Sequence, residues 1–212
     1  MTKIIEKPKI IEELASENLS LVLEKDDVFH NSFINQIIDK KIITGIEFNE
    51  CILKKIDFST NNTYFKNIRF IDIIFENCDF SNTTFELCSF TRCTFVNCKL
   101  LGVNIFNSSL FNITFNGLLR YINFANNKLK NIEFNQCILD EGRFIENKFK
   151  QLYFYNCNLE RTEFIKCDLA KIDLTSCNFD DLIVSINELN GVVMNTYKAC
   201  LMARKLGIKI EG

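Results

Sequence analysis

Residues 65–95 read FKNIR FIDII FENCD FSNTT FELCS FTRCT F, with phenylalanine at every fifth position. A spacing of five matches neither the 3.6-residue period of an α-helix nor the two-residue period of a strand. It fits a square coil in which each five-residue unit supplies one extended side and one turn. Residue i then lies over residue i+20, paired as in a parallel sheet at about 4.8 Å. The segment therefore predicts an all-β solenoid.

The same spacing continues on both sides of this segment, with Leu and Ile replacing some of the Phe. Between Phe33 and Phe179 it includes 29 positions, all Phe, Leu or Ile, and these hold 18 of the 21 phenylalanines. Because each of these side chains would point into the coil, they are the predicted core. About seven coils would form a rod roughly 35 Å long.

The position two residues before each core residue also points inward but has less room, and it accounts for most of the cysteines. Parallel columns of thiols cannot converge on a tetrahedral zinc ion, and disulfides need an oxidising compartment. We therefore interpret these thiols as small core residues and predict no metal or cofactor. Nine of the ten cysteines take this position: Cys51, Cys78, Cys88, Cys93, Cys98, Cys137, Cys157, Cys167 and Cys177.

Several units resemble the pentapeptide-repeat pattern of small residue, Asp or Asn, Leu or Phe, and two variable residues. Examples are CDFSN at 78–82 and CDLAK at 167–171. The resemblance implies a right-handed quadrilateral β-helix. Larger residues such as Ile68, Ile73 and Ile113 in the small position suggest local bulging of a face.

Two breaks interrupt the spacing, with a step of seven from Phe58 to Phe65 and of nine from Phe115 to Phe124. We interpret them as insertions of two and four residues that form short loops near 59–64 and 116–121. Loops on a solenoid often carry its binding surface, although a tolerated surface insertion is the alternative. The candidate partner-binding residues in them are Asn61, Asn62, Tyr64, Gly117, Leu118, Arg120 and Tyr121.

The two ends differ from the repeats, which divides the chain into a cap at 1–27, a β-helix at 28–194 and a C-terminal segment at 195–212. Asn195 is a suitable N-cap for a helix that runs to about Leu206, with Gly207 after it. Ile208 and Ile210 then alternate with Lys209 as in a short edge strand. The candidate residues for covering the first coil are Ile10, Ile11, Leu14, Leu19, Leu21 and Leu23.

Residues 189–201, LNGVVMNTYKACL, and 206–210, LGIKI, resemble the C-terminus of the Qnr-type quinolone-resistance group. The resemblance implies a homodimer formed through this end. It also implies a rod that mimics B-form DNA, binds DNA gyrase or topoisomerase IV and relieves fluoroquinolone inhibition. The breaks here are shorter than that group's loops, so a repeat scaffold that binds another macromolecule remains the alternative. The implied dimerisation residues are Met194, Tyr197, Leu201, Leu206, Ile208 and Ile210.

The charge is nearly balanced, with 25 basic and 27 acidic residues, which argues against a strongly basic nucleic-acid binder. We therefore expect no direct nucleic-acid binding. Residues 133–188 nevertheless contain eleven acids and six bases, a net of −5, as a DNA mimic would need. The candidate acidic partner-binding residues are Glu141, Glu146, Glu160, Glu163, Asp168 and Asp173.

No catalytic motif is present, and the single histidine, His30, precedes the repeats without a nucleophile motif beside it. We therefore expect a binding protein rather than an enzyme. The first residues do not resemble a signal peptide, and no apolar run is long enough to span a membrane. These features favour a cytoplasmic protein.

Overall fold

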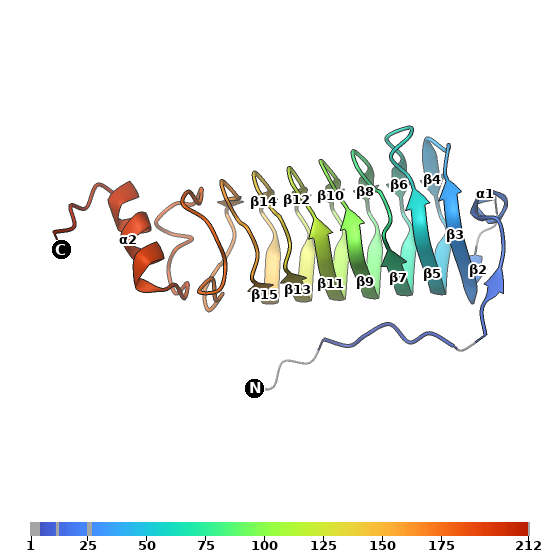
Figure 1. Cartoon of the computed structure of the whole chain (residues 1–212), viewed down its shortest axis with the longest axis horizontal. Helices are drawn as coiled ribbons and strands as arrows, with labels where there is room; N and C mark the ends of the chain where they lie inside the picture. Colours follow the sequence, from blue (N-terminus) through green and yellow to red (C-terminus); the bar gives the residue numbers. More distant parts are fainter. Residues whose placement is uncertain (1–4, 12, 25–26, 212) are drawn as a thin grey trace.

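The computed structural model describes residues 5–11, 13–24 and 27–211, which form a straight parallel β-solenoid of about seven turns (Figure 1). One sheet has nine strands in the order β1-β3-β5-β7-β9-β11-β13-β15, with β2 beside β5. Its strands are β1 (Ala15–Ser16), β2 (Asp27–Phe29), β3 (Asn31–Ile37), β5 (Glu47–Asp57), β7 (Arg69–Glu76), β9 (Ser89–Lys99), β11 (Ser109–Leu118), β13 (Lys128–Asn135) and β15 (Lys148–Tyr155).

A second sheet contains seven strands of three residues each, in the order β16-β14-β12-β10-β8-β6-β4. Its strands are β4 (Ile42–Thr44), β6 (Tyr64–Lys66), β8 (Thr84–Glu86), β10 (Asn104–Phe106), β12 (Asn123–Ala125), β14 (Arg143–Ile145) and β16 (Glu163–Ile165). Two helices, α1 (Leu19–Val22) and α2 (Thr196–Lys205), lie at opposite ends of the rod (Figure 1). The fold is the quadrilateral β-helix with a C-terminal helix that the sequence predicts.

The square section has four faces, which we number in chain order. Face 1 is formed by the short strands, face 2 by the first halves of the long strands, and face 3 by their second halves. Face 4, opposite face 2, is joined by isolated bridges such as Asp57 to Asp79 and Ile138 to Asn158. At almost every corner one residue has a φ near +55°, for example Asn67, Asp72 and Asn77. Asn is frequent there because its side chain tolerates the left-handed region.

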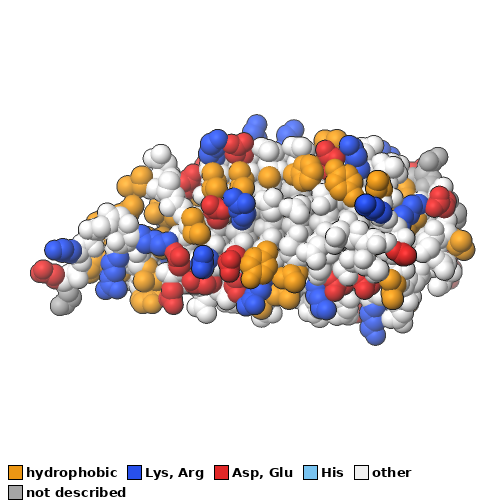
Figure 2. Space-filling view, turned by 90° about the horizontal axis from the view of Figure 1, so that it is seen from above, with side chains coloured by type: hydrophobic (Ala, Val, Ile, Leu, Met, Phe, Trp, Pro, Cys, Tyr) orange, Lys and Arg blue, Asp and Glu red, His pale blue; other side chains and the backbone are white. Residues whose placement is uncertain are grey.

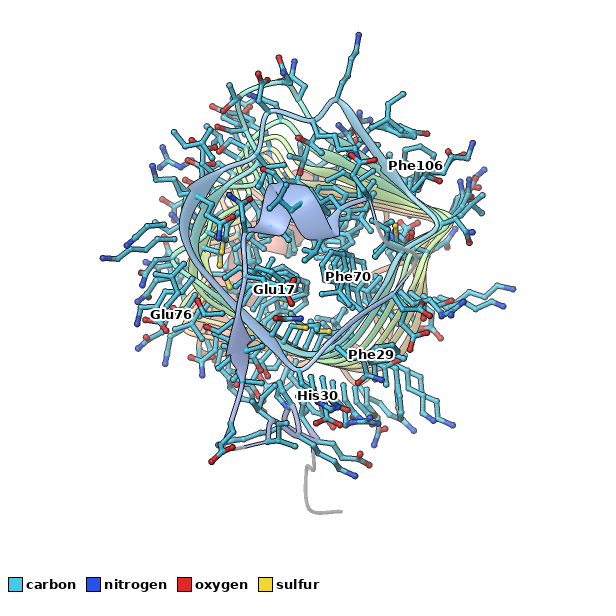
Figure 3. The ribbon with its side chains drawn as sticks, turned by 90° about the vertical axis from the view of Figure 1, so that its right-hand side faces the viewer. Glu17, Phe29, His30, Phe70, Glu76 and Phe106 are labelled. Atoms are coloured by element: carbon cyan, nitrogen blue, oxygen red, sulfur yellow. The ribbon has the colours of Figure 1, made fainter. Side chains whose placement is uncertain are left out.

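The core consists of stacked rings along the rod axis. Phe65 stacks on Phe85 and Phe75 on Phe95, each with ring centroids 4.5 Å apart, and Phe70 is edge-on to both Phe75 and Phe85. Figure 3 looks along the rod and shows Phe70 inside the coil, while Glu76 and Phe106 point outward from different faces. An aromatic pair in such geometry contributes about 0.5–1.5 kcal/mol beyond its buried area. The axial stacking of rings therefore holds each coil to the next.

The first break is a true insertion. β4 pairs with β6 at a spacing of 22 residues, Ile43 opposite Phe65, so two residues are added at the corner between faces 4 and 1. In Figure 1 this turn stands above its neighbours.

The second break is not an insertion, and the predicted loop at 116–121 is wrong. Leu119 is fully buried at the core position of face 4, so the step of nine contains two units with one residue missing. The register slips at that corner, where Gly117 comes to pair with Cys98. Gly117 has a φ of +143°, and a Cβ there would lie 2.8 Å from the amide nitrogen of Cys98. A glycine is therefore needed to close a coil of nineteen residues.

The ends are capped by apolar contacts. Leu19, Val22 and Leu23 are buried over the first coil, because one helical turn puts them on the same side, whereas the predicted cap residues Leu21 and Ile11 are exposed. At the other end α2 follows the predicted bounds, with the Asn195 side chain accepting from the Lys198 amide. The predicted strand at 208–210 does not form; this segment is irregular and its isoleucines are exposed.

Residues 5–11 run beneath the rod towards the middle of the coils (Figure 1). There the amide of Lys9 donates to the carboxylate of Asp72 at 2.9 Å, and Asp72 also binds Arg92 at 2.6 Å. The segment therefore lies along the corner between faces 2 and 3 and covers Asp72, which is buried.

Nine cysteines occupy the predicted inner positions and are buried as free thiols. Cys88, Cys93 and Cys98 each donate from Sγ to a backbone carbonyl of the preceding coil, at 3.4–3.5 Å. Burial raises the pKa of Cys93 to about 12 and that of Cys88 to about 11. Neither thiol is therefore ionised or reactive near neutral pH.

We predict that Gly117→Ala lowers the free energy of unfolding by about 2–4 kcal/mol, because the new methyl group displaces the Cys98 backbone. Gly45→Ala is the matched control. Gly45 also has a positive φ, but a Cβ there meets nothing within 4 Å, so a loss of about 1 kcal/mol is expected. Urea denaturation of both variants measures the difference. Equal losses would contradict the proposed fit of the short coil.

Thiol reactivity tests the packing of the cysteines. With a thiol reagent at pH 8, only the half-buried Cys200 should react quickly in the folded protein, and all ten cysteines after denaturation. Cys200→Ser should remove the fast phase. Rapid reaction of several thiols in the folded protein would contradict the structure.

Candidate functional site

Most of the charged side chains on face 4 are carboxylates. Asp57 and Asp79 near the N-terminal end each accept from the serine two residues later, at 2.6–2.9 Å. Further along the rod, Asp140, Glu160 and Asp180 follow one another at twenty-residue spacing. Six carboxylates lie on this face among the described residues, against Lys99 and Arg120 as the bases. They are Asp39, Asp57, Asp79, Asp140, Glu160 and Asp180.

The C-terminal half of this face continues around the corner onto face 1. We call the following six residues the acidic edge: Asp140, Glu141, Glu160, Glu163, Asp180 and Asp181. Figure 2, which looks down on this corner, shows acidic side chains gathered there with basic ones between them. The arginines of this region partly neutralise the edge, since Arg120 binds Asp140 at 2.8 Å and Arg143 binds Glu163 at 2.6 Å.

Hydrogen bonds hold the acidic edge in place against the terminal helix. A carboxylate oxygen of Glu160 accepts from the amides of Asp180, at 2.7 Å, and Asp181, at 3.3 Å. Asp181 pairs with Lys205 of α2. The hydroxyl of Tyr197 donates to Asp180 at 3.1 Å, and this bond raises the pKa of Tyr197. Glu160, Asp180 and Asp181 are therefore held in place by these bonds.

Only three of the six predicted acidic residues converge. Glu141, Glu160 and Glu163 belong to the acidic edge, whereas Glu146 lies at the corner of faces 1 and 2, paired with Lys166 at 2.5 Å. Asp168 is on face 2 and Asp173 on face 3, where two bonds from Thr175 hold the pKa of Asp173 below its usual value. The sequence prediction left out Asp140, Asp180 and Asp181, which the twenty-residue spacing would have placed beside Glu160.

The predicted loop residues divide in a similar way. Asn62 and Tyr121 lie on the same corner as Glu141, and Arg120 is beside it on face 4, so these join the edge that leads to the acidic residues. Asn61 on the projecting turn donates to Asp39, and the Tyr64 hydroxyl donates to Glu86. Gly117 is packed against the backbone of Cys98, and Leu118 ends β11 on face 4, so neither lies in a loop.

The six predicted dimerisation residues also separate into two groups. Met194 and Leu201 pack against the molecule's own core. Tyr197, Leu206, Ile208 and Ile210 are exposed beyond the last coil, with Ile208 at 54% and Ile210 at 38% of full accessibility. The exposed group leaves an apolar end on the described chain.

Two further observations concern the described parts of the chain. Within residues 5–11, 13–24 and 27–211, no three His, Cys, Asp or Glu side chains are grouped so as to hold a metal ion. No helix in the described segments is long and apolar enough to cross a membrane.

Sequence comparison identifies the family. A profile of the pentapeptide repeat region matches residues 68–144, and a second profile of eight pentapeptide repeats matches residues 148–181. The chain belongs to the pentapeptide-repeat family. A search of curated protein sequences gave no match.

Solved structures resemble the rod at low sequence identity. A trypsin-treated QnrB1, a plasmid-mediated fluoroquinolone resistance protein, is 18% identical with a TM-score of 0.58, and the match covers 85% of this chain and 97% of that one. HetL, involved in heterocyst differentiation regulation in the cyanobacterium Nostoc sp. strain PCC 7120, is 14% identical with a TM-score of 0.42, over 79% and 89% of the chains. The likeness to QnrB1 supports the pentapeptide-repeat fold.

Proposed function

We propose that this pentapeptide-repeat protein binds the DNA-binding surface of a type II topoisomerase, DNA gyrase or topoisomerase IV, and relieves fluoroquinolone inhibition. The acidic edge is the observation that carries the proposal. An enzyme that holds duplex DNA presents cationic side chains to the phosphates. A row of carboxylates can bind those same cationic side chains in place of the phosphates.

The rigidity of the edge supports this role. Successive coils repeat at about 4.8 Å, so Asp140, Glu160 and Asp180 span about 10 Å along the rod. Because Glu160 is already bonded to two amides, binding does not have to order it. Because these side chains lose less conformational entropy on binding, more of the electrostatic attraction contributes to affinity.

We infer that the protein acts as a dimer joined through its C-terminal end. The exposed Tyr197, Leu206, Ile208 and Ile210 extend the apolar end, and α2 links this end to the acidic edge through Asp180 and Asp181. Two copies joined there would place two acidic edges near the centre of a longer rod. The likeness to QnrB1, a fluoroquinolone resistance protein by its description, agrees with this assignment.

The alternative is a repeat scaffold that binds another macromolecule and has no role at topoisomerases. The absence of a projecting loop at 116–121 favours it, because the resembled group has two loops. A pull-down from lysate that recovers no subunit of gyrase or topoisomerase IV would support this alternative.

The function is tested by gyrase supercoiling with a fluoroquinolone and increasing amounts of the protein. The wild-type protein should restore supercoiling. The triple variant Glu141→Gln, Glu160→Gln, Asp180→Asn should need at least tenfold more protein, since it removes three charges but keeps the hydrogen-bond acceptors. The control Glu13→Gln, Asp168→Asn, Asp173→Asn removes three charges elsewhere and should stay within twofold of the wild type. Wild-type protein that gives no rescue at any concentration would refute the proposal.

Light scattering tests the dimer. The wild type should have the mass of a dimer, and Ile208→Asp with Ile210→Asp should be a monomer, because both side chains lie outside the protein's own core. Ile37→Asp, an exposed residue at the other end, should leave the dimer intact. A monomeric wild type at micromolar concentration would exclude this interface.

A further inference from the structure

Four lysines form a compact group on face 2, on the side of the rod opposite the acidic carboxylates of face 4. Lys128 and Lys130 are on β13, Lys148 and Lys150 are on β15, and all four are exposed. The parallel register pairs Lys128 with Lys148 and Lys130 with Lys150. Their backbones are about 4.8 Å apart along the rod and about 6.6 Å apart along each strand. We call this group the lysine quartet.

Elsewhere on the coils, many charged neighbours along the axis combine opposite charges, and the like-charged ones, such as Asp27–Glu47, Asp57–Asp79 and Glu160–Asp180, are acidic. Arg143 binds Glu163 at 2.6 Å, and Arg69 binds Glu47 at 2.5 Å. The other such pairs are Lys54–Glu76, Lys66–Glu86, Arg92–Asp72, Lys99–Asp79, Arg120–Asp140 and Lys166–Glu146. The quartet instead places like charges in adjacent positions of the ladder, which is unfavourable.

No salt bridge to a carboxylate involves the quartet in the described part of the chain. The nearest axial acid, Asp168, follows Lys148 by one coil, and its carboxylate accepts from the amide of Ala170 at 2.9 Å. Lys130 lies over the ring of Phe111, with Nζ 4.6 Å from the ring centroid. That contact orders one lysine without neutralising it. The four ammonium groups therefore remain available to an external anion.

We propose that face 2 at β13 and β15 is a docking surface for the phosphate backbone of a nucleic acid. Duplex DNA has one negative charge per about 1.7 Å, and each lysine that contacts a phosphate releases condensed counterions. A flat, exposed set of flexible ammonium groups fits such an extended, densely charged chain. Ammonium groups act as point charges and contact the backbone without reading bases, so the binding does not depend on sequence.

The proposal revises the expectation, based on total charge, that the protein does not bind nucleic acid. Lys148 and Lys150 fall within residues 133–188, which are acidic as a whole, and only the coil register puts them beside Lys128 and Lys130. The surface is on the opposite side of the rod from the acidic carboxylates of face 4. Its test uses the protein and nucleic acid alone, so its outcome does not depend on any topoisomerase activity.

The experiment is fluorescence anisotropy of a labelled 20-base-pair duplex titrated with the full-length protein at several salt concentrations. We expect micromolar binding at about 50 mM salt, and a log–log slope of about −3 to −4, as four phosphate contacts require. The variant Lys128→Gln, Lys130→Gln, Lys148→Gln, Lys150→Gln should bind at least tenfold more weakly and lose most of the slope. A duplex of different sequence should bind equally well.

The matched control is Lys41→Gln, Lys55→Gln, Lys99→Gln, Lys209→Gln, which removes four exposed lysines that lie away from face 2. It should bind within twofold of the wild type. The single variant Lys150→Glu gives Lys130 an opposite axial neighbour and has the uncharged Ala170 on the next coil, so it should weaken binding and raise the melting temperature at low salt. This second readout shows that the loss of binding does not come from unfolding.

Three results would overturn the proposal. The first is no binding to the duplex at about 50 mM salt, and the second is an equal loss in the quartet variant and its control. The third is competition by poly-glutamate, at equal charge concentration, that matches competition by unlabelled duplex. That result would assign the surface to an acidic polypeptide instead.

Discussion

The in-register stacking of one coil on the next is the constraint on which the rest of this structure depends. Because the backbone returns to the same face after about twenty residues, each side chain lies over the corresponding side chain of the preceding coil. Inside the rod this puts phenylalanine on phenylalanine, with centroids as close as 4.5 Å, and thiols in columns beside them. A single residue lost at Gly117 is accommodated only because that position has no side chain.

The same constraint organises the surface. A charged side chain on one coil has a neighbour about 4.8 Å away on the next coil. The two charges interact appreciably at that distance even in water, because it is shorter than the screening length of about 8 Å at physiological salt. Many charged axial neighbours are therefore ion pairs, as Arg143 and Glu163 illustrate. The acidic edge and the lysine quartet are two places where one sign accumulates, and the quartet is on face 2, opposite the face 4 carboxylates of the edge. The rod can thus present a carboxylate surface to a protein and a cationic surface to a polyanion.

Much of this architecture is readable from the sequence, because a period of five repeated over 29 positions has few structural solutions. The core residues, the inner cysteines and α2 all follow from spacing and capping. The step from Phe115 to Phe124 is ambiguous in sequence, since nine residues are either one unit of five with four extra residues or two units with one residue missing. Only the burial of Leu119 decides between them. Ile208 and Ile210 alternate as in a strand, but no described strand pairs with them. Charge totals along the chain do not show which residues share a face. The predicted acidic residues therefore lie on four faces, and the lysine quartet is visible only from the coil register.

The central claim is that the acidic edge occupies the surface where a topoisomerase holds DNA, and competition binding tests it most directly. Gyrase is immobilised, the quartet variant with four glutamines is bound to it, and duplex DNA is titrated in; this variant removes direct contact between the protein and the duplex. The account predicts that DNA displaces the protein completely. It also predicts that the apparent affinity of DNA for gyrase weakens as the concentration of the protein rises. Simultaneous binding of both, with neither affinity changed, would contradict it.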